Sequence, residues 1–269
     1  MSDLLTRVNE QPRAVLDAIA RSMTVRAAEP AMRAICARYM AQIGLPAGAR
    51  VLEVGCGNGA VTKLAMRHLA PAEVVGIDPS PVFIAMATES FAGEPRAAFA
   101  LGDAAASGQP DGSFDLVIAH TVYSHLRDPQ AALAEARRVL KPGGRLAIFD
   151  ADFAGLSVAQ CDGDPLQAAA AVVLRHLVHA PHIMRRLPAL IAAAGLSLQS
   201  LEPHGYVQTE RPDYLLTLLA RGMSAAARAG EIGAALVDSF DREARWRVAN
   251  GTFFGALLFL SLVARKPGA

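Results

Sequence analysis

The stretch Val51–Ala65, VLEVGCGNGAVTKLA, constrains the fold of this chain more than any other segment. An apolar run with one acid, Glu53, leads into glycines at positions 55, 57 and 59, and a helical pattern follows. A strand that turns through glycines into a helix brings bare backbone against a ligand, because side chains would block the approach. The stretch therefore predicts a ligand-binding turn between a buried strand and a helix.

Short apolar runs alternate with polar or helical patterns through the first half of the chain: RVLEVG, EVVGID, AAFALGD, FDLVIAH and GRLAIFD. This alternation predicts a doubly wound α/β fold with a parallel sheet covered on both faces. Beyond residue 151 the pattern changes to long Ala- and Leu-rich helical segments, with LSLQSLEP between them. The run FFGALLFLSLVA, Phe253–Ala264, is shorter than the roughly 20 residues of a membrane span, and we interpret it as a buried strand.

These patterns predict a single domain over residues 1–269. Residues 49–150 form its ligand-binding core. A helical cover is expected from residues 1–43, 151–194 and 205–250, and the last two strands from residues 195–204 and 255–266.

The charge balance argues against large charged partners. The chain has 26 Lys and Arg against 25 Asp and Glu, a net charge of +1, which offers no electrostatic footprint for nucleic acid and no polybasic membrane anchor. Cys36, Cys56 and Cys161 lie far apart and lack the spacing of a disulfide framework or a zinc site. Since the first residues show no signal-peptide pattern, we expect a cytoplasmic protein that binds a small uncharged or mixed-charge molecule.

Acids at the ends of three predicted strands indicate the ligand. The spacing G-x-G-x-G differs from the G-x-G-x-x-G of nicotinamide dehydrogenases. Glu53 beside the turn would repel a pyrophosphate but suits a cation such as a sulfonium or an amino group. Asp78 follows the glycines by about 20 residues, where an acid can bind both hydroxyls of a ribose. Asp103 ends the third strand and is placed to accept from an adenine amino group.

Over residues 49–150 these motifs resemble those of the class I S-adenosylmethionine-dependent methyltransferases. VLEVGCGNG resembles the first motif of the family, GIDPS its ribose-binding acid and GDA its adenine contact, and FDLVIAHTVYSHLRDP and RVLKPGGRLAIFD resemble later motifs. RVLKPGG with SHLRDP is most similar to the branch that includes the ubiquinone and menaquinone biosynthesis methyltransferases and many bacterial small-molecule methyltransferases. The resemblance implies a Rossmann-like sheet of seven mostly parallel strands, the last antiparallel, with S-adenosylmethionine as the cofactor.

The resemblance also implies which residues bind this cofactor. The methionine moiety is expected against Glu53 and the glycine turn, the ribose against the end of the second strand, and the adenine against the end of the third. His120 is expected beside the cofactor, and Arg26 from the N-terminal segment is a candidate for its carboxylate. The full predicted set is Arg26, Glu53, Gly55, Cys56, Gly57, Gly59, Asp78, Pro79, Asp103, Ala104 and His120.

The chemistry of methyl transfer requires few catalytic groups. A sulfonium methyl group is already activated, so the enzyme chiefly aligns the acceptor and excludes water. A base would help with a phenol, an alcohol or a carbon acid, and Tyr123 and His125 follow the fourth strand toward the expected acceptor. For both residues the alternative is packing or capping, and the catalytic residues stay unassigned.

Two further groups could bind a metal. His176 and His179 share a helix face, with His182 nearby, but no neighbouring Cys or acid completes a site, and we predict no metal. Asp150 and Asp152 end the fifth strand at the rim where catechol-type methyltransferases place metal-binding carboxylates. Because no acid follows the fourth strand, substrate positioning or loop capping is the preferred interpretation.

The cover supplies candidates for acceptor binding. Arg185 and Arg186 could clamp an anionic substrate, with solvated arginines as the alternative. The apolar character of the cover suits a hydrophobic acceptor, and Met223, Phe240 and Trp246 are the residues to test for contact with it, with core packing as the alternative.

The expected function is methylation, on O, C or N, of a small hydrophobic organic acceptor. One alternative is a protein of the same fold that holds S-adenosylmethionine and catalyses another reaction. A non-catalytic binding or regulatory module is a second, and a nicotinamide dehydrogenase a remote third. The acceptor, the methylated atom and the oligomeric state stay open.

Overall fold

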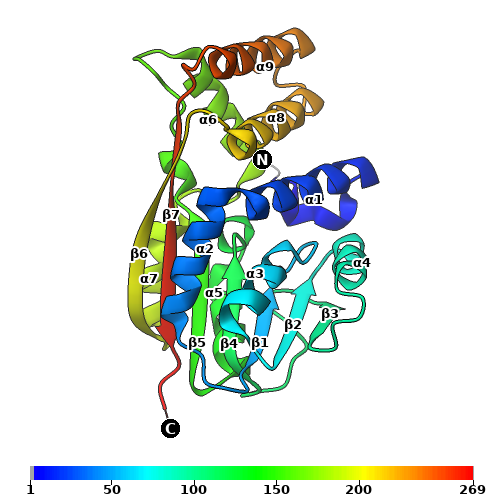
Figure 1. Ribbon diagram of the computed structural model, residues 1–269, viewed down its shortest axis with the longest axis vertical. Coiled ribbons are helices and arrows are strands. Elements are labelled where there is room, and N and C mark those ends of the chain that lie inside the picture. The colour runs from blue at the N-terminus through cyan, green and yellow to red at the C-terminus, as the bar shows by residue number, and fades with distance from the viewer. Residues whose placement is uncertain (1–2, 269) are drawn as a thin grey trace.

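The computed structural model describes residues 3–268 and contains one seven-stranded sheet with helices on both faces (Figure 1). The strands lie in the order β3-β2-β1-β4-β5-β7-β6. The first five are parallel to one another, and β7 is antiparallel to both of its neighbours. The predicted doubly wound, mostly parallel sheet is therefore confirmed. The strands are β1 (Arg50–Val54), β2 (Glu73–Asp78), β3 (Ala97–Leu101), β4 (Phe114–His120), β5 (Leu140–Ala151), β6 (Ser197–Gln208) and β7 (Gly255–Arg265).

The sixth strand is longer than predicted. It was expected over residues 195–204, but it pairs with β7 as far as Gln208. In its second half His204, Tyr206 and Gln208 are buried and the residues between them are exposed, which is the alternation of a half-buried strand. The polar and glycine content of HGYVQ obscures this alternation in the sequence.

Several helices begin at a proline behind a capping side chain. In α2, α4, α5 and α6 the residues Glu29, Ser80, Asp128 and Asp164 accept backbone N–H groups of the first turn. No helix within residues 3–268 has both the length and the apolar character to cross a membrane. The helices are α1 (Arg13–Ala28), α2 (Pro30–Ile43), α3 (Ala60–Leu69), α4 (Pro81–Ser90), α5 (Pro129–Val139), α6 (Pro165–Leu177), α7 (Ile183–Ala193), α8 (Asp213–Arg228) and α9 (Ala234–Ala249), with short 3-10 turns η1 (Leu5–Glu10), η2 (Tyr123–His125) and η3 (Phe153–Gly155).

The two faces of the sheet bury separate apolar cores. Val51 points into the core under α2 and α3, whereas its neighbour Leu52 points into the core under α5 and α7. Successive side chains of a strand point to opposite faces, so each central strand supplies both cores. The nearly continuous apolar runs in the sequence are explained by this double burial.

The helical cover (α1, α6, α8 and α9) lies beyond the carboxyl ends of the parallel strands, with α1 between the sheet and the other three helices (Figure 1). In this cover α6 and α8 pack closely at Gly222, where an added Cβ would lie 2.7 Å from the Cα of Val173. Glycine is required there because the two backbones leave no room for a side chain. The cover is thus packed against the carboxyl ends of the parallel strands, where the glycine turn lies.

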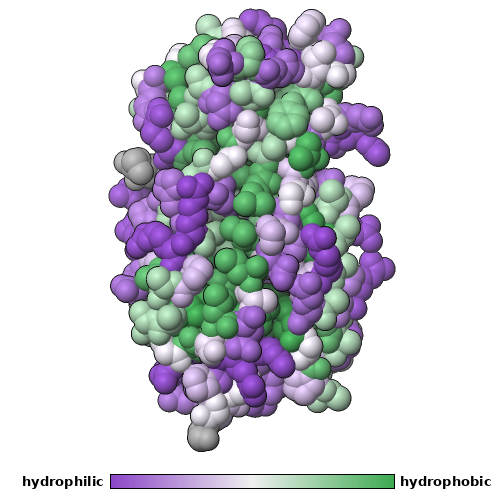
Figure 2. All heavy atoms as spheres, turned by 90° about the vertical axis from the view of Figure 1, so that its left-hand side faces the viewer, coloured by the Kyte–Doolittle hydropathy of each residue, from purple (hydrophilic) through white to green (hydrophobic). Residues whose placement is uncertain are grey.

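The β6 edge of the sheet exposes apolar side chains. Leu198, Leu201, Val207 and Leu258 are each more than a third exposed. Figure 2 views the molecule from the side on which β6 and β7 lie and shows hydrophobic surface along the middle of that side. This edge is far in the sheet order from the glycine turn of β1.

Candidate functional site

A cavity of about 490 Å³ lies at the carboxyl ends of β1 to β4. Because β1 lies between β2 and β4, the strand order reverses here, and open α/β sheets bind ligands at such switch points. The volume falls within the range of about 300–1,000 Å³ that is usual for small-molecule sites. From the predicted set, the cavity is lined by Gly55, Asp78, Pro79, Asp103 and Ala104.

The turn after β1 requires glycine for its backbone. Gly55, Gly57 and Gly59 have φ values of +66°, +54° and +79°. An added Cβ at Gly55 would lie 2.6 Å from a methyl group of Val122, and at Gly57 it would lie 2.7 Å from the Sδ of Met23. Gly55 lines the cavity, while Gly57 is covered by Met23 of α1 and Gly59 begins α3.

Asp78 is held at the end of β2 with its carboxylate toward the cavity. Its Oδ2 accepts the N–H of Gly57 at 3.0 Å, and its Oδ1 accepts the N–H of Ser80 at 2.9 Å. Burial raises the pKa of Asp78 to about 6, and the two hydrogen bonds oppose this shift. Each carboxylate oxygen keeps a second lone pair, so the group can also accept from the hydroxyls of a ligand.

Asp103 and Ala104 line the same cavity from the segment after β3. The Oδ1 of Asp103 accepts the N–H of Ala105 at 2.8 Å, which fixes the turn. The carboxylate is otherwise exposed and can accept from a ligand amino group.

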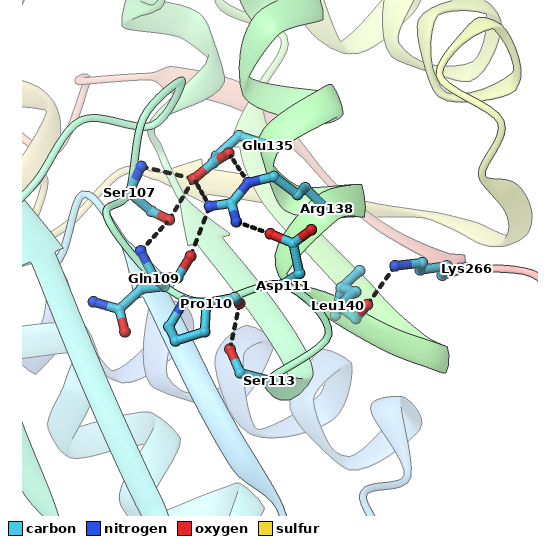
Figure 3. A network of polar contacts seen from close by, with 9 residues as sticks. All are labelled: Ser107, Gln109, Pro110, Asp111, Ser113, Glu135, Arg138, Leu140 and Lys266. Carbon is cyan, nitrogen blue, oxygen red and sulfur yellow. Dashed lines mark hydrogen bonds and ion pairs between the residues drawn. The ribbon is translucent and has the colours of Figure 1, made fainter.

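A network of polar contacts ties the continuation of this segment to α5 (Figure 3). Glu135 accepts the N–H of Ser107 at 2.8 Å, and Arg138 donates to Glu135 and to the carbonyl oxygen of Gln109, both at 2.7 Å. Arg138 also pairs with Asp111. Arg138 and Ser107 lower the pKa of Glu135 to about 2. The network therefore anchors the segment that follows Asp103 and Ala104.

Glu53 lies beneath the glycine turn and does not line the cavity. It accepts from the hydroxyl of Thr62 at 2.6 Å. Burial raises the pKa of Glu53 to about 7, the hydrogen bond opposes this shift, and the charge of Asp78 adds to it. A cationic ligand nearby would favour the ionised carboxylate. Cys56 is also buried, with its thiol directed at the carbonyl oxygen of Gly57, and burial raises its pKa.

His120 is buried in the core. It lines neither this cavity nor the smaller cavity beside it. Its Nδ1 lies 3.0 Å from the hydroxyl of Tyr39, and its ring stacks on Phe149 with centroids 4.5 Å apart. Burial, with a smaller effect from the charge of Arg26, lowers the pKa of His120 well below its usual value. A neutral, stacked imidazole supports the floor of the site rather than contacting a ligand directly.

A second cavity of about 50 Å³ joins the first under the helical cover. The two share Leu5, Met23, Thr121 and His125 as lining residues. Thr121 has a φ of +55°, an uncommon conformation for a residue with a branched side chain, and its N–H donates to the carbonyl oxygen of Phe149 at 2.6 Å. The strained residue thus lies where the two cavities meet.

The two candidate bases have different surroundings. The Nδ1 of His125 lies 2.7 Å from the Oδ2 of Asp3, which also accepts the N–H of His179 at 3.0 Å. His125 lines both cavities. Tyr123 lies instead in the core under α5, where burial raises its pKa, and it lines neither cavity. The structure places His125 within reach of a ligand and leaves Tyr123 outside.

The candidate metal ligands have partners of other kinds. His176 is paired with Glu231 at 3.1 Å, Asp150 accepts the N–H of Ser124 at 2.9 Å, and His182 precedes α7. Asp152 accepts three hydrogen bonds from Arg185, which is therefore not a free clamp for an anion. In the part of the chain that the structure describes, no three His, Cys, Asp or Glu residues are grouped so that they could hold a metal ion.

The three acceptor-contact candidates of the cover do not line the two cavities. Met223 is buried in the core, Phe240 packs against that core, and Trp246 is 57% exposed on α9. Helical periodicity identified an apolar cover but did not show which of its faces meets the site.

Several lining residues were not predicted. They are the η1 turn over the first cavity, Met23, Thr121 and Arg221. Asp3, which lines neither cavity but anchors the N-terminal segment at His125, was not predicted either. An acid at position 3 and an isolated arginine at position 221 give no sequence signal, because their partners lie more than 100 residues away.

Comparison with known proteins identifies the family. A family model described as a methyltransferase domain matches residues 52–148. The chain is 31% identical over 223 residues to an uncharacterised 37.1 kDa protein of transposon TN4556 from Streptomyces fradiae, covering 81% of this chain and 63% of that protein. It is 40% identical over 115 residues to the 2-methyl-6-phytyl-1,4-hydroquinone methyltransferase of Synechocystis, covering 41% and 36%. Residues 52–148 of the chain therefore form a methyltransferase domain of the class I S-adenosylmethionine-dependent family.

The fold of this methyltransferase family is shared over most of the chain. The [4+2]-cyclase SpnF superposes with a TM-score of 0.56 at 22% identity, over 88% of this chain and 82% of that one. The chain spans less than two thirds of the length of both curated relatives named above.

The residues of the first cavity fit S-adenosylmethionine, the cofactor of the family. Gly55, which has no side chain and where an added Cβ would collide with Val122, lines the cavity, and Asp78 keeps lone pairs for ribose hydroxyls.

Proposed function

We propose that this chain transfers the methyl group of S-adenosylmethionine to a small, hydrophobic organic acceptor. The observation that carries the proposal is that Gly55, Asp78 and Asp103 line one cavity, which joins a second, mainly apolar cavity at Thr121 and His125. The first cavity matches the parts of the cofactor, and the second, at about 50 Å³, offers a place for one small group of the acceptor.

Within this proposal most residues of the predicted cofactor set have a defined task. Asp78 binds the ribose, with Pro79 beside it, and Asp103 with Ala104 meets the adenine. The glycine turn admits the methionine moiety, and Arg26 meets its carboxylate. Glu53, one layer below the turn, supplies negative charge that favours a cation above it.

The acceptor is proposed to be apolar because of the lining of the second cavity. Phe153, Leu177 and Leu218 form its walls with other apolar side chains. The name of one relative specifies a phytyl-substituted hydroquinone, which is an acceptor with a large apolar part. This supports the same class for the present chain.

Catalysis is proposed to depend mainly on alignment and on the exclusion of water. The bound cofactor supplies a methyl group on a sulfonium, activated for in-line transfer. The η1 turn and Met23 of α1 line the first cavity, while Thr121 and His125 line both cavities, at the junction where the acceptor would lie. His125 is hydrogen-bonded to Asp3, which gives it an anchoring role.

The test has two parts. Calorimetry with S-adenosylhomocysteine should show binding by the parent protein and a loss in Asp78→Asn. Incubation with S-adenosylmethionine and fractions of a small-molecule extract should then release S-adenosylhomocysteine with at least one fraction. Binding without release over all fractions would favour a different reaction or a regulatory module, and no binding would overturn the proposal.

A further inference from the structure

Two arginines of the helical cover line the second cavity without an acidic partner. Neither Arg26 of α1 nor Arg221 of α8 forms an ion pair with a carboxylate within residues 3–268, and the Nε of each is buried with no hydrogen-bond partner. Arg221 donates to the hydroxyl of Ser22 at 3.1 Å, and Arg26 lies over the ring of Tyr214, 5.9 Å from its centroid. Both guanidinium groups therefore lack a compensating charge.

Not every buried arginine of the chain lacks a carboxylate partner. Arg247 is also buried, but it donates to both oxygens of Asp164, at 2.7 and 3.0 Å, and pairs with Glu243. An arginine cannot release its proton to escape burial, so an uncompensated guanidinium is costly to the fold.

The nearest acid does not remove this excess charge. Asp3 acts on Arg221 from beyond ion-pair distance, and its oxygens already accept from Leu5, His125 and His179. Burial lowers the pKa of Arg221, and the charge of Arg26 adds to the shift. The cavity is therefore a place where bound anions would be stabilised.

A groove continues from Arg221 to the surface between α1 and α8, with a volume of about 740 Å³. Arg21 and Arg228 line it as well, and Asp213 is the acid among its lining residues. Arg245 also lines it but is paired with Asp241. Arginines around an entrance raise the local concentration of anions, and the apolar side chains of the groove suit an apolar ligand body.

The second cavity has two arginines without a carboxylate partner, whereas the cofactor carries one carboxylate. Arg26 is the candidate for that carboxylate, so Arg221 remains available for a second anionic group. We propose that Arg221 binds an anionic oxygen group, a carboxylate or a phosphate, carried by the methyl acceptor. The acceptor would thus be an apolar molecule with an anionic group that faces α8. This inference rests on the proposed function, because it takes the first cavity as the cofactor site.

The experiment uses the full chain saturated with S-adenosylhomocysteine and three probes of nearly the same shape. Phenylacetate and benzylphosphonate carry the two anionic groups, and phenylacetamide is the neutral match. Calorimetry should show that at least one anion binds and that phenylacetamide binds at least about tenfold more weakly. The stronger of the two anions identifies carboxylate or phosphate as the preferred group.

Arg221→Gln should weaken binding of that anion by at least about tenfold and leave the affinity for S-adenosylhomocysteine unchanged. Arg33→Gln is the matched control, because Arg33 is exposed on α2 and lines none of these cavities. Arg221→Met keeps most of the aliphatic stem and removes the charge, so the Tm of the ligand-free protein should rise.

Three results would overturn the inference: equal binding of phenylacetamide, no binding of either anion, or unchanged anion affinity in Arg221→Gln. A lower Tm in Arg221→Met would also overturn it, since the guanidinium would then stabilise the fold. The proposed function fails separately, if the parent protein does not bind S-adenosylhomocysteine.

Discussion

Two regions meet at the site: the carboxyl ends of β1 and β2, called the edge below, and the helical cover. They differ in how their buried polar groups are hydrogen-bonded. At the edge, both oxygens of Asp78 accept backbone N–H groups, and Glu53 accepts from Thr62. In the cover, the buried Nε atoms of Arg26 and Arg221 have no partner. The edge is thus preorganised by the chain itself, while the cover keeps donors for a ligand. Under the proposed function, the edge would determine the cofactor and the cover would determine the acceptor.

The largest expected effect is at the glycine turn. Gly57→Val should abolish binding of S-adenosylhomocysteine, because the residue has a φ of +54° and its Cβ would press against Met23. Gly48→Val is the matched control, since Gly48 has a φ of +77° with no atom within 4 Å of an added Cβ. Both variants should lose about 1–3 kcal/mol of stability through backbone strain. Calorimetry and thermal unfolding separate the two effects, and equal binding by both variants would make the glycines purely structural.

Asp78→Asn should weaken S-adenosylhomocysteine binding by about tenfold or more, since a hydrogen bond to a charged group contributes about 1.5–3 kcal/mol. The amide keeps one acceptor oxygen and the shape of the side chain. Asp115→Asn is the control. Asp115 is the second residue of β4, at the amino end of that strand, and it pairs with Lys141. If the two variants bind the ligand equally well, Asp78 does not hold the ribose.

The pH dependence should distinguish cofactor and product. Burial raises the pKa values of Glu53 and Asp78 to about 7 and about 6, above their ordinary values of 4.5 and 3.8. S-adenosylmethionine should therefore bind more weakly as the pH falls below about 7, by up to about tenfold per unit, because its sulfonium favours the charged carboxylates. S-adenosylhomocysteine, which has no sulfonium, should depend less on pH. If calorimetry from pH 6 to 8 shows the same pH dependence of affinity for both ligands, the sulfonium does not lie near Glu53 and Asp78.

The same two groups affect the stability of the ligand-free protein in the opposite direction. Their folded-state pKa values are raised, so the folded protein binds more protons than the unfolded chain between the two sets of values. Their contribution to stability should therefore increase as the pH falls from about 7 toward about 5. Glu53→Gln should reduce this dependence in thermal unfolding.

The smallest expected effect is in the cover. Asp3→Asn should speed dissociation of S-adenosylhomocysteine by less than about tenfold, because Asp3 holds η1 over the cavity through His125 and the N–H of His179. Asp17→Asn, which removes an exposed pair with Arg13, is the control. His125→Asn should behave like Asp3→Asn in surface plasmon resonance. A loss of 10²-fold or more in methyl transfer with unchanged dissociation would instead identify His125 as a base.

Sequence reasoning predicted several residues that line the first cavity, because its parts are local. Gly55, Asp78 and Asp103 lie at or just after the end of a strand, and parallel strands bring their carboxyl ends together whatever the rest of the chain does. The resemblance to the family also predicted seven mostly parallel strands with the last one antiparallel.

The cover was not predictable in the same way. Arg221 meets Ser22 across 199 residues and Asp3 meets His125 across 122, and no periodicity records such pairs. Tyr123 and Trp246 show the reverse error, since a residue type suited to ligand contact lies in the core in one case and at the surface in the other. The face that a helix turns toward a site is set by tertiary packing, which these helices reach only after the sheet is assembled.

The most direct test of the account is a crystal structure of the protein with S-adenosylhomocysteine bound. The account predicts ribose hydroxyls within hydrogen-bond distance of the Asp78 carboxylate, the homocysteine carboxylate at Arg26, and the guanidinium of Arg221 still without an anionic partner. A ligand bound elsewhere, or one whose carboxylate pairs with Arg221, would contradict the division of the site between the sheet edge and the cover.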